Sequence, residues 1–265
     1  GLGDVYKRQV LALLAVLPRV WRAAREMPAL LLARYAGIGV VVAAHWLAFY
    51  GAIKLANASV ATICLAVAPL ATTLFEPLIH GARIRPRDLV LGIAVIPGVV
   101  LIAGGIPKGM TSGVWVGLLA ALLGAAFMSL NKRWIGERDA LAVTAIEMGA
   151  GLVAVLAALP LLQDGEAWLA RPAARDFGLL LVLATACTIL PFALSLVALR
   201  QVSAFTMQLA INLEPIYAIA IAALLLGEAH ELGATFYLGA AIVLAAVLAQ
   251  GVFARQRAAI PPSAE

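Results

Sequence analysis

Stretches of about 20 apolar residues recur along the chain, separated by short polar breaks. At a rise of about 1.5 Å per residue, a helix of that length crosses the roughly 30 Å of hydrocarbon in a bilayer. The pattern predicts eight complete spans, at 31–53, 58–79, 89–106, 113–131, 140–162, 177–199, 204–227 and 232–253. The residue-by-residue alternation of a membrane β-barrel is absent. The predicted fold is therefore an all-α integral membrane protein, a helical bundle.

The first nine residues differ from the rest of the chain. The segment GLGDVYKRQ is polar and charged, and the apolar VLALLAVLP follows it without a loop. Because the opening resembles the translated end of a transposon adapter, residues 1–9 are excluded from the fold prediction. Residues 10–17 are too few to cross a bilayer, so we interpret them as the second half of a truncated helix, with a short native interfacial segment as the alternative.

Composition and charge support a membrane protein and predict its orientation. Hydrophobic residues make up 64% of the 265 residues and charged residues only 12%, against about 45–50% and about 25% in soluble domains. With the loop at 18–29 in the cytoplasm, twelve Lys and Arg side chains lie on that side, and only Lys54, Lys108, Arg171 and Arg175 lie on the other. This asymmetry predicts a cytoplasmic C-terminus. The net charge of +5 is then explained by topology and anionic lipid rather than by nucleic acid.

Two segments of the chain repeat each other. When residues 52–81 are laid over 198–227 without a gap, five positions match at a constant offset of 146 residues: Ala52 with Ala198, Lys54 with Arg200, Ala58 with Ala204, Pro69 with Pro215 and Gly81 with Gly227. The predicted topology runs these two spans in opposite directions. Inverted repeats of this kind are typical of secondary transporters, whose substrate site lies near the midplane at the repeat interface.

The repeat also predicts the domain organisation. Five spans follow residue 112, so each unit is expected to hold five helices. The first repeat, residues 10–109, then lacks its first helix and part of its second. The second repeat covers residues 110–254, and residues 255–265 are expected to form a cytoplasmic tail.

Glu214 is the strongest candidate for a transport residue. An ionisable group at mid-membrane costs about 2.5–3.5 kcal/mol, so it is expected to face a cavity or a partner. Glu214 lies near the centre of the 204–227 span, directly before Pro215, which frees a backbone carbonyl. Helical spacing places Tyr217 on the same face and Gln208 on the far side, so we expect Glu214 and Tyr217 in the cavity and Gln208, with Asn212, in interhelical hydrogen bonds. The alternative is a carboxyl tied to a neighbouring helix without contact to substrate.

The equivalent span 58–79 carries a second polar stripe. Thr62, Pro69, Thr73, Glu76 and His80 lie along one side of it, which is consistent with a pathway wall. The alternative is that the Thr hydroxyls bond to their own helix and that Glu76 extends toward nearby arginines. Prolines that interrupt corresponding helices in both halves are the best pointer in a sequence to a transporter site.

Weaker candidates lie on three other spans. His45 and Tyr50, on the 31–53 span, could line or gate a cavity, or His45 could be a satisfied intramembrane histidine. Glu147, one third of the way into the 140–162 span, is a candidate second cavity carboxyl. Pro191 interrupts the 177–199 span beside several polar side chains that could serve packing alone.

Several of these segments match a known family. HWLAFYGAIKLANASVATICLA, LFEPL, LNKR, IEMGAG and above all SAFTMQLAINLEPIYAIAIAALLLGE resemble the EamA-type branch of the drug/metabolite transporter superfamily. The resemblance implies ten helices, arranged as two inverted five-helix repeats around a central cavity, of which eight complete helices and one partial helix are present here. It also implies movement of small metabolites, amino acids or related solutes across the bacterial inner membrane, often outward. Residues 212–215, residues 75–77 and the Glu147 helix resemble recurring polar positions of that branch.

We therefore expect a secondary transporter that works by alternating access, with Glu214 either binding a coupled proton or pairing with a cationic substrate. A passive facilitator of the same architecture is the main alternative, followed by a non-transporting scaffold. An intramembrane enzyme is disfavoured because no GxSxG or HExxH pattern occurs. The expected partners are a small-molecule solute and the lipid bilayer, with a homodimer as a further candidate and no nucleic acid. No cofactor or metal is expected.

Overall fold

The structure, a computed structural model, describes residues 21–22, 25–81, 86–162, 174–211, 214–226 and 232–258. The adapter-like residues 1–9, the proposed half helix at 10–17 and residues 259–265 of the predicted tail lie outside this range. The described residues form helices and connections, without a strand.

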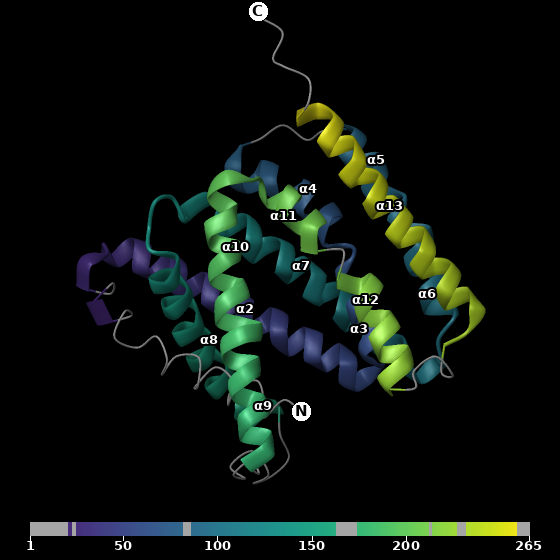
Figure 1. Ribbon diagram of the computed structural model, residues 1–265, viewed down its shortest axis with the longest axis horizontal. Helices are drawn as coiled ribbons and strands as arrows, with labels where there is room; N and C mark the ends of the chain where they lie inside the picture. The colour runs from purple at the N-terminus through teal and green to yellow at the C-terminus, as the bar shows by residue number, and fades with distance from the viewer. Residues whose placement is uncertain are drawn as a thin grey trace, which may run out of the picture. The chain divides into compact units, whose positions relative to one another are not determined.

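The helices follow one another as α2 (Ala29–Leu55), α3 (Ala58–Leu65), α4 (Ala68–His80), α5 (Pro86–Ile93), α6 (Val95–Gly104), η1 (Lys108–Met110), α7 (Thr111–Trp134), α8 (Ala140–Leu162), α9 (Ala174–Ala184), the π-helix η3 (Thr185–Ile189), α10 (Leu190–Gln201), α11 (Ala204–Ile211), α12 (Glu214–Ile221), the π-helix η4 (Ala222–Leu226) and α13 (Ala234–Ala258) (Figure 1). The described residues of each of the eight predicted spans are mainly helical, so the predicted all-α fold is confirmed. The last helix, α13, runs to Ala258, past the predicted end of its span at residue 253.

Several predicted spans are divided into shorter pieces, and proline explains two of the divisions. Proline has no N–H, so the carbonyl four residues earlier loses its helical donor. The first piece ends at that residue both times: at Leu65 before Pro69 and at Ile93 before Pro97. The equivalent position before Pro215 lies beside residues 212–213, which are outside the described range. In the 177–199 span, the chain widens instead into η3 just before Pro191.

The helix that follows Pro69 ends at a glycine for a conformational reason. Gly81, the C-cap of α4, has φ +68° and ψ +16°, the left-handed region that L side chains avoid. Its N–H donates to the Pro77 carbonyl at 2.9 Å, which satisfies one of the carbonyls left open at the end of a helix. A glycine is therefore required at this position by backbone geometry.

The chain folds into two compact units, and each contains sequence from both halves. The first consists of residues 1–47 and 130–201, and the second of residues 48–129 and 202–265. In the first unit, α8 packs against α10, and Tyr35, Met148, Leu196 and Leu199 are fully buried. Asp139 caps the start of α8, because its Oδ1 accepts the N–H of Leu141 at 2.9 Å.

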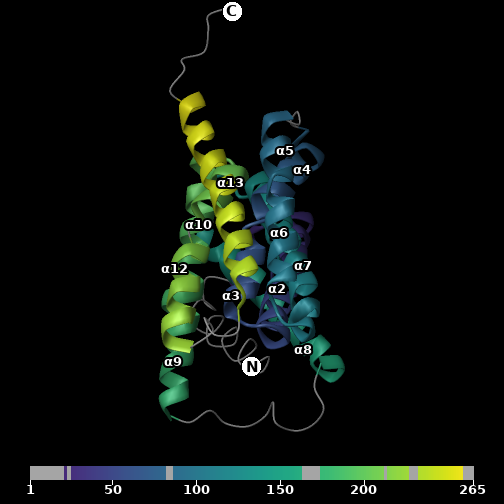
Figure 2. The ribbon, with the colours of Figure 1, turned by 90° about the vertical axis from the view of Figure 1, so that its right-hand side faces the viewer.

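In the second unit, α6 and α13 lie side by side along their length (Figures 1 and 2). A Cβ on Gly98 would lie 2.8 Å from the Gly239 carbonyl oxygen, and one on Gly239 would lie 2.5 Å from that of Gly98. The two backbones therefore touch directly, as small residues allow in membrane bundles. Ile102, Phe236 and Val243 belong to the apolar cluster around this contact.

The 146-residue offset of the sequence recurs in local structure. Helices α3 and α11 begin 146 residues apart, at Ala58 and Ala204. Both α3 and α11 carry the same cap: Asn57 Oδ1 accepts from Val60 N at 2.9 Å, and Ser203 Oγ accepts from Thr206 N at 3.0 Å. The chain is thus built from two structural repeats.

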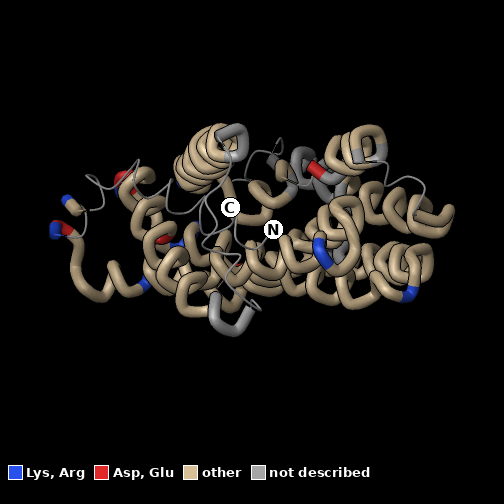
Figure 3. The backbone as a smooth tube through the Cα atoms, turned by 90° about the horizontal axis from the view of Figure 1, so that it is seen from below, with Lys and Arg blue, Asp and Glu red and all other residues tan. Residues whose placement is uncertain are grey.

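The outer surface is that of a membrane protein. Many large apolar side chains are exposed, with Leu224 at 84% and Leu78 at 81%, and Figure 3 shows that most of the helical backbone carries no charged residue. Five helical stretches among the described residues are long and apolar enough to cross a bilayer: Ala29–Leu55, Ala58–His80, Lys108–Trp134, Ala140–Ala158 and Phe177–Gln201. An apolar exterior of this extent is stable in lipid rather than in water.

Candidate functional site

The two equivalent interrupted helices cross each other in the second unit. The first part of each packs against the second part of the other: α3 against α12, and α4 against α11. This pairing requires the two spans to run in opposite directions. If each helix is replaced by its equivalent in the other repeat, the α3–α12 contact becomes the α11–α4 contact, and the reverse. That is the symmetry of an inverted repeat about a twofold axis. We call the four helix parts α3, α4, α11 and α12 the crossing.

Glu76 joins the two repeats within the crossing. It is half-buried on α4, and its Oε1 accepts the backbone N–H of Phe205, the second residue of α11, at 3.2 Å. The first N–H groups of a helix have no intrahelical acceptor, and the helix dipole favours a carboxylate there. Together with the Ser203 hydroxyl, Glu76 therefore caps α11 from another helix.

We expect Glu76→Ala to lower the free energy of unfolding by about 1 kcal/mol, because it leaves an N–H at the start of α11 without its acceptor. Glu76→Gln keeps a carbonyl oxygen at the same place, so its loss should be smaller. Thermal unfolding of the purified protein in detergent measures both. Glu137→Ala, which changes an exposed carboxyl, serves as the control. Equal stability of Glu76→Ala and the wild type would contradict the capping role.

The threonines of the first interrupted helix are bonded to their own helix. Thr73 Oγ1 donates to the Pro69 carbonyl at 2.9 Å, Thr72 Oγ1 to Ala68 at 2.9 Å, and Thr62 Oγ1 to Ala58 at 2.7 Å. This is the bonding that the alternative interpretation of the stripe described. His80, at the end of α4, lies with its Nε2 3.1 Å from the Ser129 carbonyl oxygen.

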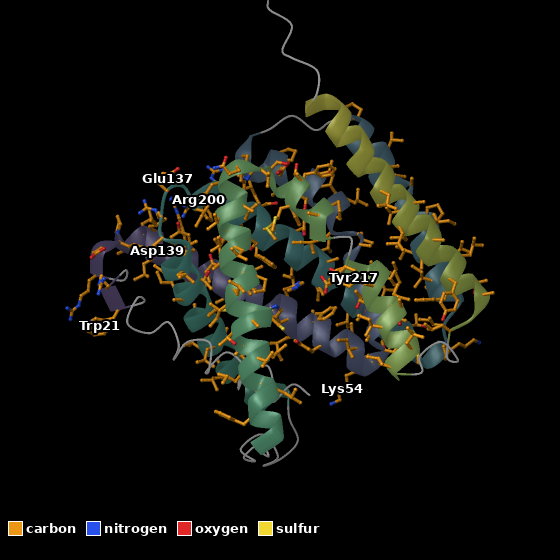
Figure 4. All side chains as sticks on the ribbon, viewed as in Figure 1. Trp21, Lys54, Glu137, Asp139, Arg200 and Tyr217 are labelled. Atoms are coloured by element: carbon orange, nitrogen blue, oxygen red, sulfur yellow. The ribbon has the colours of Figure 1, made fainter. Side chains whose placement is uncertain are left out.

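Glu214 is the first residue of α12 and is half-buried, and Tyr217, one turn later, is 57% exposed (Figure 4). Gln208, on α11, is only 4% exposed. Asn212, between α11 and α12, lies outside the described residues. The predicted assignment of Glu214 and Tyr217 to one face of the span and of Gln208 to the other stays a prediction.

The first unit holds a separate buried polar pair. Glu147 on α8 is fully buried, and its Oε2 accepts from Asn131 Nδ2 at 3.2 Å. Helix α2 approaches Glu147 so closely that a Cβ on Gly39 would lie 2.2 Å from the Glu147 carbonyl oxygen. The pair is therefore enclosed by α2, by the end of α7 and by α8.

The remaining predicted positions are divided between the two units. His45, on α2, belongs to the first unit, and Tyr50, on the same helix, to the second; both are half-buried. The ring of Tyr50 meets that of Phe49 edge-on, with centroids 5.7 Å apart. Pro191 follows η3, where Thr188 Oγ1 donates to the Leu183 carbonyl at 2.7 Å. A π-helix within a span often marks a functional position.

Of the predicted positions, Thr73 and Glu76 lie on α4, which packs against α11, and Glu214 and Tyr217 lie on α12, which packs against α3. His45, Glu147 and Pro191 belong to the other unit. Among the described residues, no group of three or more His, Cys, Asp or Glu could hold a metal ion.

Sequence reasoning missed two residues of the first unit. Asn131 belongs to the LNKR segment but not to the predicted site residues, and neither does Tyr35, which is fully buried and donates from its hydroxyl to the Trp134 carbonyl at 2.6 Å. A usable signal existed for Asn131: it is an amide near the end of one span, and a carboxyl lies in the next, so a tight antiparallel hairpin could have been expected to pair them.

Basic side chains of this unit bind backbone carbonyls. Lys132 Nζ donates to the Leu199 carbonyl at 2.6 Å, and the Arg200 guanidinium donates to the Arg138 carbonyl. Arg200 and Glu137 lie at the same end of the unit in Figure 4. These contacts tie α7 and the connection to α8 to the end of α10, and they occupy cations that could otherwise pair with a buried carboxylate.

Comparisons with known proteins agree with this architecture. The sequence model of the EamA-like transporter family matches residues 6–104 and 111–250, in two blocks that correspond to the two repeats. A solved structure described only as "Crystal structure of protein" matches with a TM-score of 0.61 and 17% sequence identity, over 96% of this chain and 87% of that one. At that identity the likeness concerns the fold alone. No curated protein matches the chain.

Proposed function

The chain belongs to the EamA-like transporter family, and on that premise we propose that it moves a small metabolite, amino acid or drug-like solute across the bacterial inner membrane by alternating access, in the outward direction. The observation that supports this most directly is the antiparallel pairing of the two interrupted helices, α3 with α12 and α4 with α11. Interrupted helices at equivalent positions of inverted repeats are where transporters place their substrate site.

The crossing suggests how access could alternate. In the predicted topology, with the C-terminus in the cytoplasm, α4 and the start of α11 lie toward the cytoplasmic side, and α3 and α12 toward the other. Because the two contacts are at opposite ends of the same helix pair, a tilt that tightens one loosens the other. The Glu76 bond to Phe205 N would then hold the cytoplasmic end closed.

Within this proposal, Glu214 makes the main polar contact with the solute. It directly precedes Pro215, whose missing N–H leaves a backbone carbonyl available to a ligand. Tyr217 is exposed one turn away on the same helix part. His45, Tyr50 and Glu147 are further candidates for the pathway or its control. We propose transport rather than catalysis for all of them.

A metabolite screen tests the proposal. Cells that express the protein and cells that carry an empty vector are grown in parallel, and the medium is compared for excreted solutes. We expect at least one small solute to be enriched with the protein, and everted membrane vesicles to accumulate it. A medium and vesicles without any difference would contradict a transport function.

The same vesicles distinguish a driven transporter from a passive facilitator. Collapsing the proton gradient removes accumulation by a proton-driven transporter, whereas a facilitator equilibrates the solute in either condition. We expect accumulation to be lost while equilibration remains.

A further inference from the structure

Glu147 and Asn131 form a buried pair with two unsatisfied acceptors. Glu147 is 0% exposed and Asn131 is 1% exposed. Asn131 Nδ2 donates to Glu147 Oε2, but the other oxygens, Glu147 Oε1 and Asn131 Oδ1, have no hydrogen-bond partner among the described residues. A buried polar atom left without a partner costs about 1–3 kcal/mol, and more if it is charged. Two such acceptors on one bonded pair require an explanation.

The ionisable groups around the pair do not supply the missing donor in the described part of the chain. The Tyr35 hydroxyl on α2 donates to the Trp134 carbonyl, Lys132 on α7 to Leu199, and Arg200 on α10 to the Arg138 carbonyl. Arg138 itself lies in the connection between α7 and α8 and is exposed. Arg34, on α2, places its guanidinium over the Trp134 ring, 5.2 Å from the ring centroid. His45, also on α2 in this unit, is six residues beyond Gly39, where α2 contacts the Glu147 backbone.

We propose that the Glu147–Asn131 pair is a proton-binding site. A proton taken from water bonds to Glu147 Oε1, and the resulting O–H donates to Asn131 Oδ1 while Asn131 Nδ2 continues to donate to Oε2. A carboxylic acid and a primary amide can form two hydrogen bonds to each other in this way, because each offers one donor and one acceptor. One hydrogen atom satisfies both unpaired oxygens, and releasing it to water restores the carboxylate.

The packing explains how such a site could be controlled. Glu147 is enclosed because α2 touches the α8 backbone at Gly39 and because α8 packs against α10. Water reaches the carboxyl only when one of these helices moves away from α8. This inference deepens the proposed transport function and rests on it. In a transporter, a proton site that helix movement opens can couple the proton gradient to the conformational change.

Infrared spectroscopy of the purified, full-length protein in lipid vesicles tests the site without any solute. We expect a carbonyl band of a protonated carboxylic acid at neutral pH that is lost in Glu147→Gln, shifted in Asn131→Leu and unchanged in the surface control Glu137→Gln. A wild-type spectrum without a band that depends on Glu147 overturns the proposal. A band that disappears when Na⁺ replaces K⁺ overturns it too, since the site would then hold a metal cation.

Thermal unfolding provides a second readout. In Glu147→Gln, the side-chain N–H can donate to Asn131 Oδ1 in place of the acid O–H, and the side-chain carbonyl can accept from Asn131 Nδ2. Both hydrogen bonds are kept, so this variant is expected to have a melting temperature equal to or above that of the wild type. Glu147→Leu, which leaves the Asn131 amide unpaired, is expected to melt lower. Wild-type stability should fall as the pH rises, because deprotonation leaves acceptors facing each other, and Glu147→Gln should lose this dependence. Equal destabilisation by Gln and Leu would overturn the proposal.

A transport measurement separates this inference from the function it rests on. We expect Glu147→Gln to let the solute equilibrate but to abolish its accumulation against a gradient. A Glu147-dependent band in a protein that moves no solute refutes the transport function and leaves the proton site standing. Transport without that band, or full accumulation by Glu147→Gln, refutes the proton site alone.

Discussion

Glu214→Gln is expected to reduce transport to background while leaving the amount of protein in the membrane unchanged. The substitution preserves size and removes the charge at the junction of α11 and α12, the midpoint of one interrupted helix. A hydrogen bond to a charged group contributes about 1.5–3 kcal/mol, so its loss lowers the affinity for a solute by roughly 10-fold or more. Solute flux in everted vesicles, normalised to the protein present, is the measurement.

The control for this prediction is Glu137→Gln, the same chemical change at an exposed carboxyl outside the crossing. Its flux should equal that of the wild type. Unchanged flux in Glu214→Gln would place the solute contact elsewhere. A flux that recovers at high solute concentration would indicate that Glu214 contributes to binding rather than to the conformational step.

Gly39→Ala is expected to destabilise the protein strongly, and Gly37→Ala, on the same helix, is not. A Cβ at position 39 would lie 2.2 Å from the Glu147 carbonyl oxygen and 2.8 Å from its carbonyl carbon, whereas one at position 37 meets nothing within 4 Å. Since the obstruction is backbone, α2 and α8 must separate, and overpacking of this kind costs about 1–3 kcal/mol.

The two glycine variants are expected to change the stability of the protein in opposite directions. Alanine favours helix over glycine by up to about 1 kcal/mol, so Gly37→Ala should be neutral or slightly stabilising. Melting temperatures in detergent and elution profiles on size exclusion compare the two directly. If both variants melted with the wild type, α2 and α8 would not be in backbone contact, and the enclosure of Glu147 would lose its main support.

The crossing shows which structural features the residue pattern could predict. Pro69 was sufficient to predict the division between α3 and α4, because a missing N–H acts on the carbonyl four residues before it in any environment. The groups that Gln208 and Glu214 contact could not be derived in the same way. A helical wheel gives the face on which a residue lies, but not the helix that packs against that face.

Glu76 and Glu147 show that the sequence could identify a candidate residue without identifying its hydrogen-bond partner. Both were candidates because a carboxyl within an apolar span is costly wherever it lies. Nothing in the neighbouring residues of Glu76 indicates that it accepts from Phe205 N, 129 positions away. Likewise, the polarity of Asn131 was visible in the sequence, but its partnership with Glu147 depends on how α7 and α8 pack.

Apolar run length, the 146-residue offset and the position of Pro69 were thus enough to predict the helices, the two repeats and the division between α3 and α4, since helix length and proline act through the chain's own covalent geometry or its immediate solvent. Which helices touch, which carboxyl caps a distant helix and which buried oxygens lack a donor followed from packing in three dimensions. Those features depend on distances of a few ångströms between residues far apart in the chain, and hydrogen bonds and steric contacts are sensitive to differences of that size.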